Sequence, residues 1–175
     1  MRLPVLLVLF ASVFATAAPA RADPVTTAFN DAIAAFAAAR TQLPNEIAGV
    51  DVAAYEAALS GGRFVSRHWG GTIVLELHES ADAGGNCGRF AAFVSLPPKD
   101  GSVRLTLCPQ FSADGTPALR RLTILHEMVH VVAGPDECRA MAFAARIEQL
   151  ASGQVTPVDR YWQANGCDTS GFSLP

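Results

Sequence analysis

The pattern of apolar residues along the first third of the chain is helical. Between residues 25 and 42, large apolar side chains recur at helical spacing, and Pro44 then ends the pattern. These side chains are Phe29, Ile33 and Phe36. A second, shorter helix is expected after Asp51, which can serve as its N-cap, and Gly61-Gly62 would terminate it.

The period of the pattern changes after residue 70. Three large apolar side chains then take alternate positions, as in a strand with one buried face: Ile73, Leu75 and Leu77. Residues 89–96 and 102–108 are expected to form two further strands, separated by a turn at 97–101 that contains two prolines and a glycine. The sequence therefore predicts a small antiparallel sheet, arranged as a meander.

The helical period returns in the last third of the chain. Thr116 and Pro117 are typical of an N-cap and a first helical residue, and this helix is expected to run to Val132. Two further helices are expected over residues 136–151 and 157–166. These elements predict an α+β fold in which the small sheet packs against the helix that begins at Thr116.

Residues 1–22 have the pattern of a signal peptide. An apolar run begins directly after Arg2, and Ala20-Arg21-Ala22 is a small-residue pattern typical of a cleavage site. The continuous apolar run is shorter than the ~20 residues that a membrane-spanning helix needs. We expect a secreted or periplasmic protein with a single domain over residues 23–175; an uncleaved signal anchor is the alternative. Residues 23–60 could form a helical N-terminal subdomain or a propeptide.

Composition and charge narrow the class of partner. The chain is 50% hydrophobic and 17% charged, as is typical of globular proteins. Loss of Arg2 and Arg21 with the signal peptide would leave 11 of the 13 basic side chains against 16 acidic ones, a net charge of −5. Neither nucleic acid nor a stable association with a membrane is therefore expected.

Four cysteines in an exported chain favour two disulfides. Three connectivities are possible, and we prefer Cys87 with Cys108 and Cys138 with Cys167. The first pair would join two neighbouring strands, and the second would join the last helices. Zinc ligation by thiolates is the rival interpretation, but the sequence contains no Cys-x-x-Cys pair.

The segment His126-Glu127-Met128-Val129-His130 has H-E-x-x-H spacing inside a predicted helix. Residues four apart are offset by about 40° around a helix and about 6 Å along it, so both imidazoles can share one metal ion. Glu127 lies on a neighbouring face, from which a carboxylate can act as a general base without binding the metal. Two histidines packed or solvated for structural reasons are the alternative.

A catalytic zinc ion needs a third protein ligand, and the residues after the helix offer candidates. Gly134-Pro135 reverses the chain, so Glu137 in the next helix can return to the two histidines. Asp136 is the rival ligand, and both acids could instead complement the dipole at the N-terminus of that helix. Glu148 lies about 16 Å further along the same helix and cannot share an ion with Glu137.

These residues resemble the deuterolysin-type, or aspzincin, metalloendopeptidases, which include the peptidyl-Lys metalloendopeptidases. The resemblance covers about the last 70 residues: the segment 105–109, the H-E-x-x-H helix, the segment 134–137, and more loosely Tyr161 and Asn165. It implies a zincin-like fold with Glu137 as third ligand, where the family has Asp. The same Glu137 fits the Glu-x-x-Ala ligand signature of gluzincins. Ala140 stands where the aspzincin family has a tyrosine that supports the transition state.

The residues together predict a zinc metallopeptidase that hydrolyses a peptide or protein substrate. In this hypothesis His126, His130 and Glu137 bind Zn²⁺ and Glu127 is the general base. Tyr161 is our choice for a donor to the oxyanion, with His68 and His78 as other candidates and with anchoring of the last helix as the alternative role of Tyr161. The alternative function is a zincin-like binding or scaffold module without turnover.

Overall fold

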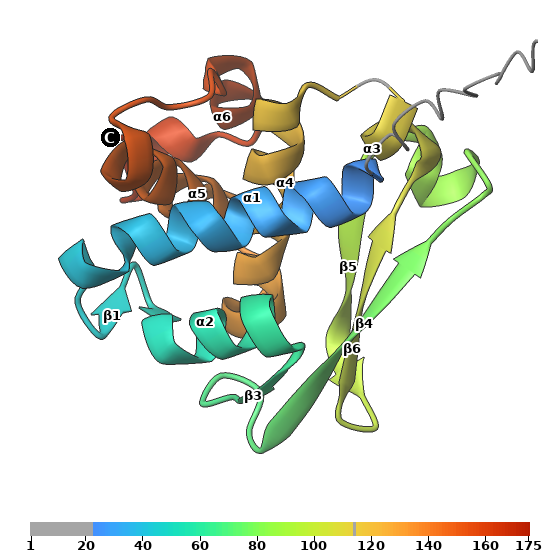
Figure 1. Cartoon of the computed structure of the whole chain (residues 1–175), viewed down its shortest axis with the longest axis horizontal. Helices are drawn as coiled ribbons and strands as arrows, with labels where there is room; N and C mark the ends of the chain where they lie inside the picture. Colours follow the sequence, from blue (N-terminus) through green and yellow to red (C-terminus); the bar gives the residue numbers. More distant parts are fainter. Residues whose placement is uncertain (1–22, 114) are drawn as a thin grey trace, which may run out of the picture.

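A computed structural model describes residues 23–113 and 115–175, so the expected signal peptide lies outside the described residues. The fold is α+β, as predicted, with a sheet beside a group of helices (Figure 1). The α-helices are α1 (Pro24–Ala39), α2 (Val52–Gly61), α3 (Pro109–Ala113), α4 (Pro117–Ala133), α5 (Glu137–Ser152) and α6 (Asp159–Ala164). Within these ranges no helix is both long and apolar enough to cross a membrane.

The remaining elements are short 3-10 helices and strands. The 3-10 helices are η1 (Arg40–Gln42), η2 (Gly85–Gly88) and η3 (Cys167–Thr169). The strands are β1 (Glu46–Ile47), β2 (Val50–Asp51), β3 (Arg63–Val65), β4 (Thr72–Glu79), β5 (Ala92–Lys99) and β6 (Ser102–Leu107). β1 and β2 form a separate two-stranded ribbon, which the sequence pattern did not indicate.

Local signals determine where the helices begin. The Asp51 side chain accepts hydrogen bonds from two backbone N–H groups in the first turn of α2, which confirms the predicted N-cap. Thr116 and Asp136 cap α4 and α5, and each accepts a hydrogen bond from the N–H three residues later. At the other end of α2, Gly62 has the left-handed conformation typical of a residue that ends a helix.

The four-stranded sheet has the order β3-β4-β6-β5 and differs from the predicted meander. β3 pairs antiparallel with β4, and β5 pairs antiparallel with β6. β4 and β6 are parallel, with Leu77 opposite Leu105. The prediction of an antiparallel sheet was therefore wrong for the central pair of strands.

Burial and backbone chemistry explain this strand order. β6 carries three buried apolar side chains, Val103, Leu105 and Leu107, which favour a central position. β5 contains Pro97 and Pro98, which have no N–H group to donate and therefore suit an edge strand. Because β5 returns antiparallel to β4 one place further out, β6 fills the gap between them and runs parallel to β4.

The turn between β5 and β6 is tighter than the sequence suggested. β5 continues through its prolines to Lys99, which pairs with Ser102, so that only Asp100 and Gly101 form the turn. Both residues have positive φ, 51° and 75°, as a two-residue type I′ hairpin requires.

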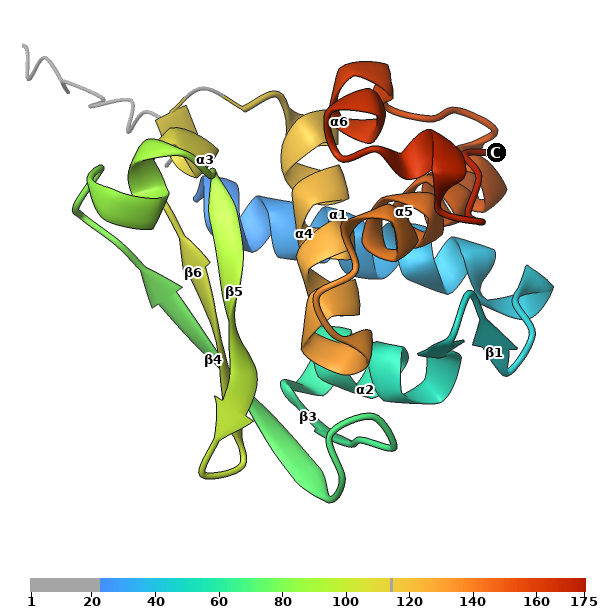
Figure 2. The ribbon, with the colours of Figure 1, turned by 180° about the vertical axis from the view of Figure 1, so that it is seen from behind.

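α4 lies between the sheet and the other long helices (Figure 2). α1 and α5 pack against it on one side, and β5 and β6 contact it on the other. Consequently every residue from Ile124 to Ala133 is buried. The cluster of buried apolar side chains extends from Val25 to Cys167, so α1 and α2 belong to the same core as α4 and α5.

Two hydrogen bonds hold α4 from outside the helix. The hydroxyl of the buried Tyr55 donates to the carbonyl oxygen of Leu125 over 2.8 Å. The indole N–H of Trp69 donates to the carbonyl oxygen of Val131, also over 2.8 Å. The residues with H-E-x-x-H spacing lie between these two carbonyls, so their stretch of backbone is fixed at both ends.

Both preferred disulfides are confirmed. Cys87–Cys108 joins η2 to the end of β6, and Cys138–Cys167 joins the first turn of α5 to η3. All four cysteines are therefore paired, and none is available as a thiolate ligand.

Candidate metal centre

α4 presents His126 and His130 one turn apart on a single face. Both residues are buried, and their Nε2 atoms lie 3.0 Å apart. This agrees with the geometry expected of residues i and i+4. The two imidazoles therefore face a common centre.

The orientation of His130 follows from the end of α4. Its Nδ1 lies 2.9 Å from the carbonyl oxygen of Gly134, which can only accept a hydrogen bond. Nδ1 therefore carries a proton, and in the neutral form of the ring, which a metal ion would bind, Nε2 directs its lone pair at the common centre. Gly134 has a φ of +90°, and a Cβ there would lie 2.7 Å from Nε2 of His68, so the position requires glycine.

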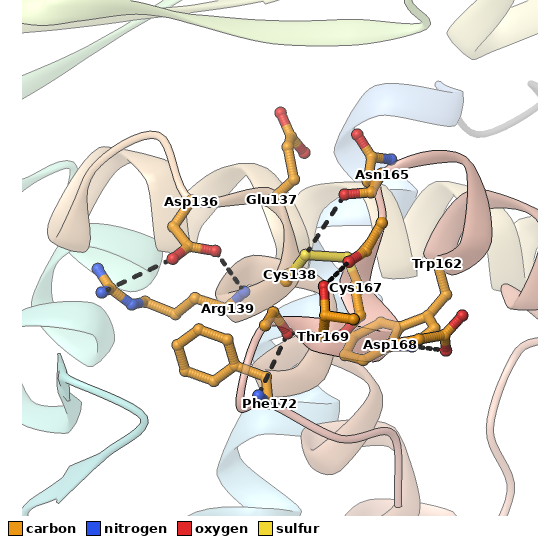
Figure 3. The surroundings of a disulfide bond; sticks show 12 residues. Asp136, Glu137, Cys138, Arg139, Trp162, Asn165, Cys167, Asp168, Thr169 and Phe172 are labelled. Carbon is orange, nitrogen blue, oxygen red and sulfur yellow. Dashed lines mark hydrogen bonds and ion pairs between the residues drawn. A yellow bond between two sulfur atoms is a disulfide. The ribbon is translucent and has the colours of Figure 1, made fainter.

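Glu137 brings a carboxylate to the same centre. Its Oε2 lies 3.1 Å from Nε2 of His126 and 3.4 Å from Nε2 of His130. Asp136 does not join this group, because its side chain caps α5 and turns toward Arg139 (Figure 3). Figure 3 also shows the Glu137 side chain pointing away from Arg139 and the disulfide.

The three ligand atoms have the spacing of a tetrahedral metal site. Ligands about 2.0–2.1 Å from an ion in tetrahedral geometry lie about 3.3–3.4 Å from one another. The observed separations are 3.0, 3.1 and 3.4 Å. His126, His130 and Glu137 could therefore hold one metal ion with little rearrangement.

The carboxylate of Glu137 and the imidazole of His130 shift each other's pKa values toward their charged forms. Burial alone would raise the pKa of Glu137, but hydrogen bonds from His126, His130 and Tyr161 outweigh burial and hold this pKa well below its usual value. Burial tends to lower the pKa of His130, yet its contact with Glu137 and the nearby charge of Glu127 raise it overall. Glu137 is thus ready as an anionic ligand.

Glu127 is a buried carboxylate beside this group. Burial raises its pKa above the usual value of 4.5, and the positive charges of His126 and His130 only partly oppose this. Within the described ranges the structure records no hydrogen bond to its carboxylate, so no structural partner accounts for its burial. A buried acid with a raised pKa next to a possible metal site is suited to proton transfer.

Tyr161 reaches the group from α6. Its hydroxyl donates a hydrogen bond to Oε2 of Glu137 and lies 3.5 Å from Nε2 of His126. Burial and then the neighbouring Glu137 carboxylate raise the pKa of Tyr161, so its hydroxyl keeps its proton. The neighbouring Trp162 is the buried anchor of α6, with its indole N–H bonded to Asp168 over 3.0 Å. The structure thus brings Tyr161, an expected site residue, to the centre.

The link between α4 and α5 is held by contacts that the sequence did not reveal. A guanidinium nitrogen of Arg139 donates to the carbonyl oxygen of Ala133 over 2.7 Å, and another lies 4.0 Å from Asp136. The disulfide Cys138–Cys167 attaches the first turn of α5 to the segment that follows α6 (Figure 3). Glu137 and Tyr161 are therefore fixed relative to each other by covalent and polar contacts.

A pocket of about 610 Å³ adjoins the group. His126, Glu127 and Tyr161 contribute to its lining. The other walls come from residues 89–92 before and at the start of β5, from the first half of α4, from Met141 and from residues 157–160. The sequence analysis did not identify these walls. Leu119 and Leu122 precede His126 at helical spacing, and this pattern could have indicated that they share a face of α4 with His126.

The other residues considered from the sequence lie elsewhere. His68 is exposed beside Gly134, and His78 is exposed on β4 in a separate pocket with Asp82 and Arg104. Neither belongs to the group of His126, His130 and Glu137. Glu148 is buried in an ion pair with Arg121 at 2.6 Å, in agreement with its expected separation from the site.

Comparisons of the chain with protein-family models, with curated proteins and with solved structures found no match. The resemblance of its C-terminal segment to deuterolysin-type peptidases therefore stays an expectation. A function for this chain must be inferred from its own geometry and chemistry.

Proposed function

We propose that this chain is an exported zinc metallopeptidase with a zincin-like site. One observation carries the proposal: the side chains of His126, His130 and Glu137 converge at metal-binding distances beside the buried acid Glu127, next to a pocket. Two disulfides support export, because such bonds persist mainly in oxidising compartments.

Zinc fits this set of donors. Two imidazole nitrogens and one carboxylate oxygen are a ligand set of catalytic zinc sites, and three protein ligands leave a fourth position for water or substrate. The hydrogen bond from His130 to Gly134 is the kind of outer contact that orients a metal-binding imidazole. When bound, zinc would lower the pKa of water and polarise a peptide carbonyl.

Glu127 performs the proton transfers in this proposal. Because burial raises its pKa, this carboxylate accepts a proton more readily at neutral pH than an exposed glutamate would. It takes a proton from the water that attacks the peptide carbonyl and then passes that proton to the leaving amine. The attack forms a C–O bond, and the transfer to nitrogen accompanies cleavage of the C–N bond.

Tyr161 is the second catalytic residue of the proposal. Its hydroxyl remains protonated and lies close to His126 and Glu137, where it can donate to the oxyanion that develops on the substrate carbonyl. In this way α6 supplies the phenol that is missing at Ala140, where the resemblance leads one to expect a tyrosine.

The alternative function is a zincin-like binding or scaffold module without turnover. A site that has lost activity would often be filled by side chains, whereas here a pocket of about 610 Å³ includes His126 and Glu127 in its lining. The buried Glu127 also favours the enzyme, since a module that only held metal would not need it.

The proposal is tested by Glu127→Gln, which preserves shape and removes the charge. Zinc content, measured by mass spectrometry, should stay at the wild-type level because all three ligands remain. Casein hydrolysis should fall about 10²- to 10⁴-fold, the usual contribution of a general base. Glu79→Gln, on an exposed position of β4, is the matched control and should change neither quantity. Wild-type activity in the Glu127→Gln protein would refute the mechanism.

A further inference from the structure

We propose that the pocket beside the metal centre selects peptides with a large apolar side chain next to the bond that is cleaved. This inference rests on the proposed function, because it names the substrate class of that same site. It is carried by the chemistry of the pocket lining and by its place along α4.

One face of α4 leads from the pocket to the metal centre. Leu119, Leu122 and His126 share this face, since they are three and four residues apart, and all three line the pocket. At about 1.5 Å per residue, Leu122 lies about 6 Å and Leu119 about 10 Å from His126 along the helix. A peptide strand advances about 3.3 Å per residue, so these leucines can contact a side chain at or next to the cleaved bond.

Most of the buried residues that line the pocket are apolar. Four of its lining residues are buried and carry no charge: Ala92, Leu122, Met141 and Val158. Leu119 and Phe90 line the same hollow but stay 46% and 43% exposed. Large apolar side chains left exposed together in a concave site favour an apolar ligand, whose burial would remove their surface from water.

Three charged lining residues are exposed: Arg89, Asp159 and Arg160. Arg89 and Arg160 are basic and Asp159 is acidic, and Arg89 is positioned 5.2 Å from the ring centroid of Phe90. A lysine or arginine side chain would therefore meet more like charge than opposite charge at these residues. Among the residues that the structure describes, Glu127 is the only other acid in the lining, and the proposal assigns it to proton transfer.

Hydrogen bonds fix the segment just before residues 157–160, which form one wall of the pocket, without any bound ligand. The backbone N–H of Thr156 donates to Oε2 of the buried Glu148 over 2.8 Å, and the Thr156 hydroxyl donates to Oε1 over 3.1 Å. Arg121 from α4 donates to the same carboxylate over 2.6 Å. Because the loop is fixed to α4 and α5, the pocket is preformed, and little ordering free energy opposes the binding of an apolar side chain.

The test is the cleavage profile of zinc-loaded protein on a peptide library, with every cleaved bond identified by mass spectrometry. We expect Leu, Met or Phe to dominate one position next to that bond. Replacing this residue by Ala in a single peptide should lower kcat/KM about 10-fold or more. Each methylene that a substrate loses from an apolar pocket lowers kcat/KM by about 10-fold or more.

Leu119→Glu places a charge in the pocket and should lower kcat/KM for the apolar peptide about 10-fold while the zinc content stays unchanged. Leu77→Glu is the matched control, since Leu77 is 47% exposed on β4 and lies outside this pocket. It should leave the profile unchanged. Should Leu119→Glu fail to fold, Leu119→Gln provides the same comparison without a charge.

The outcomes separate the two proposals. Cleavage without apolar preference, a preference for basic residues, or an unchanged profile in the Leu119 variants would overturn this inference and leave the peptidase proposal standing. No cleavage of any peptide by the zinc-loaded wild type would overturn the peptidase proposal and this inference with it.

Discussion

Two adjacent acids, Asp136 and Glu137, offer a sharp test of the proposed metal centre, because their side chains make different contacts in the structure. Asp136 accepts a hydrogen bond from the backbone N–H of Arg139 over 2.9 Å and caps α5. Glu137 lies within 3.4 Å of both imidazoles. Alanine at Glu137 should therefore lower mainly the metal affinity, and alanine at Asp136 should lower mainly the stability.

The expected magnitudes differ enough to be measured. Residues that only support a metal ligand change affinity about 10- to 100-fold, so removal of the Glu137 carboxylate should weaken zinc binding more than about 100-fold, or about 3 kcal/mol. Asp136→Ala keeps all three ligands and removes a helix cap, which costs about 1 kcal/mol of unfolding free energy. For a protein of this size that corresponds to a melting temperature lower by about 2–4 °C.

Zinc affinity can be measured by competition with a chromogenic chelator, and stability by calorimetry in excess chelator, where bound metal does not contribute. Glu137→Ala should lose most of its zinc affinity in the competition assay. Asp136→Ala should change mainly the calorimetric stability. If Asp136→Ala lost zinc while Glu137→Ala retained it, the assignment of the third ligand to Glu137 would be wrong.

Two further predictions concern Glu127 and Tyr161. In chelator, Glu127→Gln should raise the unfolding free energy at pH 7. Burial raises the folded-state pKa of Glu127 above 4.5, so the wild type is stabilised by protonation below pH 4.5 and loses this as pH rises through the folded pKa. The gain from Gln should thus grow between pH 4 and pH 7, and a gain that shrank would contradict the burial argument. Tyr161→Phe should retain zinc and lower kcat about 10- to 100-fold with little change in KM; an unchanged kcat would exclude the oxyanion role.

Much of the local structure could be predicted from the sequence. Asp51, Thr116 and Asp136 marked the starts of α2, α4 and α5, because an N-cap depends only on backbone groups two or three residues away. The spacing of His126 and His130 likewise gave their shared face, since a helix fixes residues i and i+4 relative to each other. The preferred disulfide pairs were also correct.

The order of the sheet could not be predicted in the same way. Alternation indicated one apolar face on β4, on which Ile73 is buried but Leu77 is exposed, and alternation is the same for parallel and antiparallel neighbours. The parallel pairing of β4 with β6 depends on which strand takes the centre, and that is decided by burial of Leu105 and its neighbours against the helices.

The sequence by itself determined the long helices, the starts of α2, α4 and α5, and the pair of imidazoles, because each depends on interactions within about one helical turn. Only the tertiary structure decided that Glu137 and not Asp136 turns to the histidines, that Tyr161 reaches them from 35 residues away, and that three separate segments enclose an apolar pocket with α4. These three features depend on how whole elements pack against one another, and a local pattern of residues does not reveal that packing.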